Sequence, residues 1–133
     1  MIYAGRKIFQ GVATGEALVT HMGISFYGGI DPDTGIIVER GHELEGQCIS
    51  NRILVFPTGK GSTVGSYTLY RLKHSGMAPA AIVNAVCETI TAVGCIIAGI
   101  PCIDQVPIAQ IATGTHLIVH VDDELATVET MAP

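Results

Sequence analysis

The sequence contains no tryptophan and has only three phenylalanines and four tyrosines among its 133 residues. So few aromatic rings leave little for nucleic-acid bases to stack on. Charged residues are also scarce, at 14%, and the formal net charge of −5 has the wrong sign for binding a phosphate backbone. No cluster of lysine and arginine offsets this charge. We therefore expect no nucleic-acid partner.

The sequence also lacks an apolar run long enough to cross a bilayer. Its most apolar stretch, from Ile90 to Ile103, is interrupted by Gly94, Gly99 and Pro101. It falls short of the roughly 20 residues that a membrane helix needs. The N-terminus has no basic segment followed by an apolar core, so we expect no signal peptide. These features predict a cytoplasmic protein with no membrane partner.

No pair of cysteines has the C-x-x-C spacing. The four cysteines are Cys48, Cys87, Cys95 and Cys102. The last three lie close together in sequence, but their spacing matches neither the zinc nor the iron–sulfur patterns, and no nearby histidine completes a set. We predict four free cysteines that are buried as small apolar side chains, and no metal bound by this chain.

Apolar residues make up 48% of the chain, which is enough for a core in one domain spanning residues 1–133. The N-terminal part is broken by glycine and by the turn sequence Asp31–Gly35, so it predicts short strands joined by turns. Strands are expected at residues 6–20 (two of them), 23–29, 36–39 and 53–56.

After Ser62 the apolar period becomes helical. Val64, Tyr67, Leu69, Tyr70 and Leu72 fall mainly on one face of a predicted helix. Ser62 or Thr63 is expected to cap its start, and Gly76 to end it. Further elements are expected at 80–83 (strand), 88–98 (helix), 100–103 (extended), 107–111 (one helical turn), 115–122 (strand) and 126–131 (its hairpin partner). The class is mixed α/β.

The segment Gly59–Thr63, hereafter the glycine turn, joins a predicted strand to this helix. It differs from a nucleotide-binding P-loop because Gly61, and not Ser or Thr, follows Lys60, and because Leu54 stands where that motif needs glycine. A helix N-terminus with flanking glycines and a lysine still favours an anion. The anion would be a bound carboxylate or phosphate, or a deprotonated Ser62 hydroxyl. From the pattern alone, a catalytic turn and a merely structural turn both remain open.

The histidines provide no further motif. His116 and His120 are expected on one strand, where they lie too far apart to share a metal and face solvent. His21 and His42 lie in loops beside glycines, within possible reach of a site. His74 is expected to place a favourable charge near a helix end.

Several short motifs occur in an order that resembles the small subunit, or swivel domain, of the aconitase X family. The resemblance covers nearly the whole chain. Its motifs are GEALV at 15–19, ISFYGGIDPDTG at 24–35, HELEGQ at 42–47, FPTGKGSTVGSY at 56–67, APAAI at 78–82 and AGIP at 98–101.

The resemblance implies a swivelling β/β/α domain of three layers that works with a large subunit as a heterodimer. That larger subunit would carry an iron–sulfur cluster, with none bound by this chain. The enzyme would be a hydro-lyase acting on a small carboxylate. In the related aconitase domain a serine alkoxide in a glycine-serine turn is the base. By resemblance, Ser62 is the proton acceptor, and Gly59, Lys60, Gly61 and Thr63 bind anions. Aconitase follows its two serines with a substrate-binding arginine, whereas Val64 follows Thr63 here.

Two substrates are implied by different branches of the family. Archaeal-type members dehydrate (R)-5-phosphomevalonate to trans-anhydromevalonate 5-phosphate in the mevalonate pathway of isoprenoid biosynthesis, and bacterial members dehydrate cis-3-hydroxy-L-proline. The sequence GKGSTVGSY favours the first. Outside this class, a non-catalytic anion-binding or assembly domain is the alternative, and it would keep its function after Ser62→Ala.

Overall fold

The computed structural model describes residues 1–131, so residues 132–133 of the predicted domain lie outside the described residues. Strands and helices alternate along most of the chain, as the mixed α/β prediction requires. Their bounds are β1 Ile2–Ala4, β2 Arg6–Phe9, β3 Gly11–Val19, α1 Phe26–Gly29, β4 Ile53–Phe56, α2 Gly65–His74, β5 Ala81–Asn84, α3 Thr89–Ala98, β6 Cys102–Asp104, the 3₁₀ turn η1 Ile108–Gln110, β7 His116–Val121 and β8 Ala126–Thr130.

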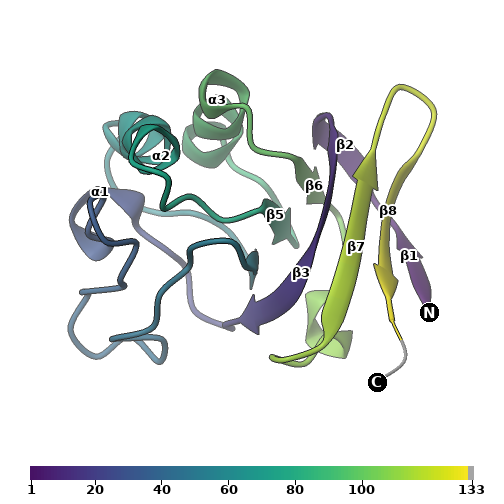
Figure 1. Ribbon diagram of the computed structural model, residues 1–133, viewed down its shortest axis with the longest axis horizontal. Coiled ribbons are helices and arrows are strands. Elements are labelled where there is room, and N and C mark those ends of the chain that lie inside the picture. The colour runs from purple at the N-terminus through teal and green to yellow at the C-terminus, as the bar shows by residue number, and fades with distance from the viewer. Residues whose placement is uncertain (132–133) are drawn as a thin grey trace.

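The long strand β3 joins two β layers. Its residues Gly11–Glu16 pair antiparallel with β7, whereas Ala17–Val19 pair parallel with β4. The complete strand order is β1-β8-β7-β3-β4-β5-β6-β2. The β1-β8-β7 side is antiparallel, and the β4-β5-β6 side is parallel with β2 antiparallel at its edge. In Figure 1 the antiparallel strands stand on one side of the molecule and α1–α3 on the other.

The middle layer is buried on both faces. In β4, Ile53 and Val55 join a core that includes residues of β7 and β8, whereas Leu54 and Phe56 join a second core that includes residues of α2 and α3. A strand alternates its side chains between opposite faces, so one apolar run contributes to both cores. The result is an antiparallel β layer, a parallel β layer and a helical layer, which confirms the predicted three-layer β/β/α fold.

The helices α2 and α3 pack closely because Gly94 has no side chain. A Cβ at Gly94 would overlap the Leu69 side chain of α2 and lie 3.2 Å from the Ser66 Cα. The Glu88 carboxylate caps α3 by accepting hydrogen bonds from the Ile90 and Thr91 N–H groups, at 2.7 and 3.0 Å. These contacts fix the helical layer beside the glycine turn.

The strand predicted for residues 23–29 is wrong. Ile24 forms a single bridge with Gly59, and Phe26–Gly29 forms the one-turn helix α1, interrupted by non-helical torsion angles at Tyr27 and Gly28. The alternation in the sequence is nevertheless real, because Ile24 and Phe26 are buried and Tyr27 is exposed. Gly28, at φ +81°, ends the extended conformation.

The predicted apolar face of α2 is wrong in part. Leu69 and Leu72 are buried as expected, but Val64, Tyr67 and Tyr70 are 44%, 69% and 51% exposed. The other buried positions of the helix are the small residues Gly65, Ser66 and Thr68, and α3 comes close to Ser66 at Gly94. The helix therefore presents apolar and aromatic side chains to solvent, and a contiguous patch of such side chains is one mark of a surface that meets another molecule.

Candidate functional site

The glycine turn lies at the carboxyl end of the parallel strand β4 and leads into the N-terminus of α2. The edge formed by carboxyl ends of parallel strands is where α/β sheets place their ligand sites. Two residues before the turn, the Pro57 carbonyl accepts hydrogen bonds from the Ala85 and Val86 N–H groups beyond β5, at 3.1 and 3.0 Å. The base of the turn is thus fixed to the neighbouring strand.

Gly59 occupies a narrow slot between two elements. On one side, the Ile24 N–H donates to the Thr58 carbonyl at 3.3 Å, and the Lys60 N–H donates to the Ile24 carbonyl at 2.9 Å. On the other side, a Cβ at Gly59 would overlap the Glu88 carboxylate and the Thr91 hydroxyl. Only glycine fits here, so the absence of a side chain determines the path of the turn.

The next glycine directs the chain toward Ser62. Gly61 has φ +93°, which disfavours any side chain, and a Cβ there would lie 2.6 Å from Ser25 Oγ. The Ser62 hydroxyl oxygen accepts a hydrogen bond from the Val64 N–H at 3.2 Å, and the Gly65 N–H donates to the Ser62 carbonyl at 2.9 Å. The Ser62 oxygen therefore lies at the positive end of α2, where negative charge is stabilised.

The prediction that Ser62 or Thr63 caps α2 is wrong in detail. Val64 is the N-cap residue, and its side chain makes no capping hydrogen bond. Thr63 contributes its carbonyl, which accepts from the Ser66 N–H at 3.2 Å. A tight turn over residues 62–65 precedes the helix. The Ser62 hydroxyl therefore lies just before the helix and faces solvent.

Lys60 does not extend freely from the turn. Its ammonium lies 3.1 Å from the Glu39 carboxylate, and both side chains are partly solvated. The two charges partly offset each other, which leaves the backbone N–H groups and the helix end as the main source of positive potential near Ser62.

The second half of the turn is open to solvent. Residues 60–64 are all exposed. Catalysis on a small molecule requires walls that exclude water and hold the substrate. This chain positions the Ser62 hydroxyl but does not enclose it, so a second molecule would be needed to complete a site around it.

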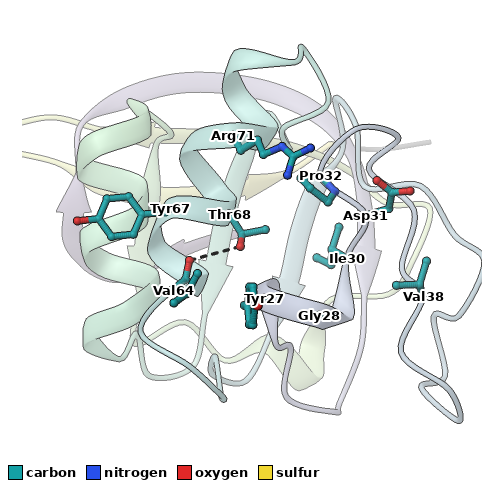
Figure 2. Close-up of a pocket in the computed structure, with 10 residues that line it drawn as sticks. All are labelled: Tyr27, Gly28, Ile30, Asp31, Pro32, Val38, Val64, Tyr67, Thr68 and Arg71. Atoms are coloured by element: carbon teal, nitrogen blue, oxygen red, sulfur yellow. Dashed lines mark hydrogen bonds between the residues drawn. The ribbon is translucent and has the colours of Figure 1, made fainter.

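One hollow lies beside the turn, and Ser62 is not among the residues that line it. It measures about 470 Å³ and separates α2 from the Tyr27–Pro32 segment, as Figure 2 shows. At its rim, Arg71 pairs with Asp33 at 3.0 and 3.1 Å. The lining residues are Tyr27, Gly28, Ile30, Asp31, Pro32, Val38, Val64, Tyr67, Thr68 and Arg71.

A second hollow, of about 420 Å³, runs between α2 and α3. Val64 and Tyr67 line both hollows and form a ridge between them. The residues that line the second hollow are Thr63, Val64, Ser66, Tyr67, Thr89, Ile90, Val93 and Ile97. Thr63 links this largely apolar groove directly to the glycine turn.

The cysteines are free, as predicted, but only three are buried. Cys87, Cys95 and Cys102 lie in the core, whereas Cys48 is exposed, so the prediction of its burial is wrong. The Cys87 and Cys102 sulfurs are 3.9 Å apart. Hydrogen bonding to Cys102, and then burial, raise the pKa of the Cys87 thiol well above its usual range. Within residues 1–131, no three His, Cys, Asp or Glu side chains are arranged to hold a metal ion.

Four histidines lie away from the turn or project into solvent. His21 is exposed, His116 is exposed on β7, His120 pairs with Asp122 at 2.8 Å, and His74 stacks on Tyr70 near the end of α2. His42 differs, because it is only 5% exposed and is hydrogen-bonded at both ring nitrogens. Its position in a loop beside glycines did not reveal this burial.

Between Met1 and Met131, no helix combines the length and apolar character that crossing a membrane demands.

Comparison with known proteins gives concordant results. Residues 2–130 match the model of the aconitase X swivel domain. The chain is 47% identical to the phosphomevalonate dehydratase small subunit of Thermococcus onnurineus, over 94% of this chain and 96% of that one. It is 50% identical to the protein of the same name from Methanothrix thermoacetophila, over 85% and 84% of the two chains. The crystal structure of Thermococcus kodakaraensis aconitase X in its holo-form superposes with a TM-score of 0.95 at 45% identity, covering 99% of both chains.

Proposed function

This chain belongs to the aconitase X swivel domain family, and from that premise we propose that it is the small subunit of a phosphomevalonate dehydratase. The enzyme is a hydro-lyase that removes water from (R)-5-phosphomevalonate in the mevalonate pathway. The observation that carries the proposal is similarity along nearly the whole chain to small subunits of that name, in a protein that presents an exposed serine at a helix N-terminus.

Ser62 is the proton acceptor in this proposal. Its oxygen already accepts the Val64 N–H, so an alkoxide at this position would keep a hydrogen bond and gain from the end of α2. The alkoxide takes the proton from the carbon next to the substrate carboxylate. The electron pair released forms the double bond, and the hydroxyl on the neighbouring carbon departs to complete the loss of water.

The rest of the glycine turn shapes and charges the site. Gly59 and Gly61 let the backbone follow a path that no other residue fits, and Thr63 begins the groove beside it. The exposed N–H groups of the turn bind the substrate anion. Lys60 adds a positive charge that Glu39 holds in place and partly offsets.

A large aconitase X-type subunit completes the site. The exposed ridge of Val64 and Tyr67, with Val93 and Ile97 in the adjoining groove, starts at the glycine turn and offers an apolar surface for that subunit. An iron–sulfur cluster carried by the large subunit would supply the Lewis acid for the departing hydroxyl. The active site then lies between the two subunits of a heterodimer.

A reducing cytoplasm is the compartment that fits this enzyme. All four cysteines are free, including Cys87 and Cys102, whose sulfurs are within 3.9 Å of each other. Secreted proteins tend to oxidise such cysteines to disulfides.

The proposal is tested by anaerobic co-expression with a large subunit of the same family, followed by mass spectrometry of the reaction mixture. We expect a stable complex that converts 5-phosphomevalonate to a product lighter by one water, whereas this chain alone is inactive. Turnover of cis-3-hydroxy-L-proline in place of 5-phosphomevalonate would show that the substrate is wrong. Two proteins that elute separately would show that the partner is wrong.

A further inference from the structure

The buried histidine His42 belongs to the loop of residues 39–44. This loop is hydrogen-bonded to the segment Thr20–Ile24, hereafter the strap, which in turn contacts the glycine turn. The Glu43 carboxylate accepts hydrogen bonds from the Thr20 hydroxyl and from the His21 N–H, and the Glu43 N–H contacts the Met22 sulfur at 3.4 Å. The loop thus contacts the strap at successive residues.

His42 makes the contact nearest the glycine turn. The Leu44 N–H donates to His42 Nδ1 at 3.1 Å, so Nδ1 carries no proton. The hydrogen is therefore on Nε2, which donates to the Gly23 carbonyl at 3.1 Å. Because His42 is only 5% exposed and both ring nitrogens are hydrogen-bonded, the side chain has one defined tautomer and orientation.

The strap is itself hydrogen-bonded to the glycine turn, so a strap held in place by His42 also holds the turn in place. Ile24 follows Gly23, and its N–H and carbonyl bond to Thr58 and Lys60 on either side of Gly59. A Cβ at Gly23 would lie 3.3 Å from the Thr58 carbonyl and 3.4 Å from the Lys60 Cδ, so the strap backbone lies flat against the turn. Shifting the Gly23 peptide would move the residues that lead to Ser62.

We propose that His42 is a positioning residue that holds the glycine turn, and with it Ser62, through the hydrogen bond from its Nε2 to the Gly23 carbonyl. The proposal rests on the proposed function of Ser62. His42 itself touches no substrate, and its effect on turnover follows from the sensitivity of proton transfer to the placement of the acceptor.

Two amide substitutions separate the two bonds of the ring. The amide of His42→Gln reaches the Nε2 position and can still donate to Gly23, whereas that of His42→Asn reaches only the Nδ1 position and can still accept from Leu44. In the heterodimer with 5-phosphomevalonate, we expect His42→Gln to keep kcat within about threefold of wild type. His42→Asn should lower kcat on the order of tenfold to a hundredfold, with a smaller change in KM. His116→Asn, on exposed β7, is the control and should match wild type.

Hydrogen exchange gives a readout that does not need activity. The Ile24 and Lys60 amides should exchange faster in His42→Asn than in His42→Gln, while the β5 amides are unchanged in both. Melting temperatures show whether each variant is folded.

Equal kcat and equal exchange in the two variants would overturn the proposal, as would a His42→Gln variant as impaired as His42→Asn. If Ser62→Ala keeps normal turnover, the proposed role of Ser62 fails, and the exchange difference alone then decides whether His42 holds the turn.

Discussion

The Lys60 ammonium and the Glu39 carboxylate lie 3.1 Å apart and tie the glycine turn to a loop 21 residues earlier in the chain. An exposed pair of this kind contributes little to stability, with typical values below about 1 kcal/mol. The pair matters more for the electrostatics of the site, because it fixes the direction of the Lys60 side chain, the one basic side chain of the turn. Negative charge on the Ser62 oxygen would therefore be stabilised chiefly by backbone N–H groups.

The first prediction concerns this pair. Lys60→Ala should lower kcat/KM by no more than about tenfold, because the turn amides and the end of α2 remain to bind the anion. Glu39→Gln should make the residual attraction for substrate more sensitive to salt, since it leaves the Lys60 charge without a partner. The measurement is kcat/KM as a function of ionic strength, with Lys73→Ala as a control at the far end of α2. If Lys60→Ala lowered kcat/KM as much as Ser62→Ala does, Lys60 would be essential, and the prediction that backbone N–H groups are the main anion-binding groups would be wrong.

The second prediction concerns the partner surface. Ile97→Asp, in the groove between α2 and α3, should weaken binding of the large subunit by about tenfold or more, because a carboxylate would be buried without a partner. Ile97 is 42% exposed, so the fold should tolerate the change. Leu125→Asp, at an exposed turn among Asp122–Glu124, is the matched control and should bind normally. Undiminished binding of Ile97→Asp in a titration followed by sizing chromatography would remove this groove from the interface.

The sequence revealed most of the strands and helices because their apolar periods are local. The arrangement of these elements in three layers was harder to predict from the sequence. In β4, an unbroken apolar run contributes Ile53 and Val55 to one core and Leu54 and Phe56 to another, and a run buried on both faces does not show which neighbour lies on which side. The three layers came instead from the resemblance to a known family, and the strand pairing confirms them.

The site was partly predictable for a similar reason. Glycines and a lysine before a helix indicate an anion site from local chemistry alone, so Gly59–Thr63 could be singled out. The strap could not, and His42 was recognised only as a loop residue within possible reach of a site, because their contacts join segments that are far apart in the chain. Tyr67 and Tyr70 were placed on the wrong face, since the sequence does not show that α2 meets Gly94 of α3 through Ser66 and Leu69.

The third prediction concerns thiol chemistry. In the native chain, iodoacetamide should modify Cys48 first, because it is exposed, whereas Cys87, Cys95 and Cys102 should react only after unfolding. The raised pKa of Cys87 further suppresses its thiolate. Peptide mass spectrometry of a time course with and without denaturant measures this order. Rapid native labelling of Cys102 would be inconsistent with the core described above.

The fourth prediction concerns acid stability. The hydrogen bond from His120, and then those from the Glu124 and Leu125 N–H groups, lower the pKa of Asp122 from 3.8 to about 2. Between those values the unfolded chain binds more protons than the folded chain, so Asp122 stabilises the fold above about pH 4 and this contribution is lost as the pH falls toward 2. Asp122→Asn should lower stability at neutral pH and flatten its dependence on pH in that window. Urea unfolding from about pH 2 to 5 tests this, and parallel curves for the two proteins would contradict it.

The last prediction separates the catalytic and structural roles of one hydroxyl. Ser62→Ala removes the acceptor of the Val64 N–H, which should cost about 1 kcal/mol of stability or less. If Ser62 is the proton acceptor, kcat in the heterodimer should fall on the order of 10²- to 10⁴-fold with partner binding intact. Ser75→Ala is the matched control at the other end of α2, where the hydroxyl donates to the Pro32 carbonyl at 2.6 Å. That variant should lose stability but keep kcat. Near-normal turnover by Ser62→Ala would move the proton acceptor out of this chain and into the large subunit, and would leave the glycine turn as an anion-binding and assembly element.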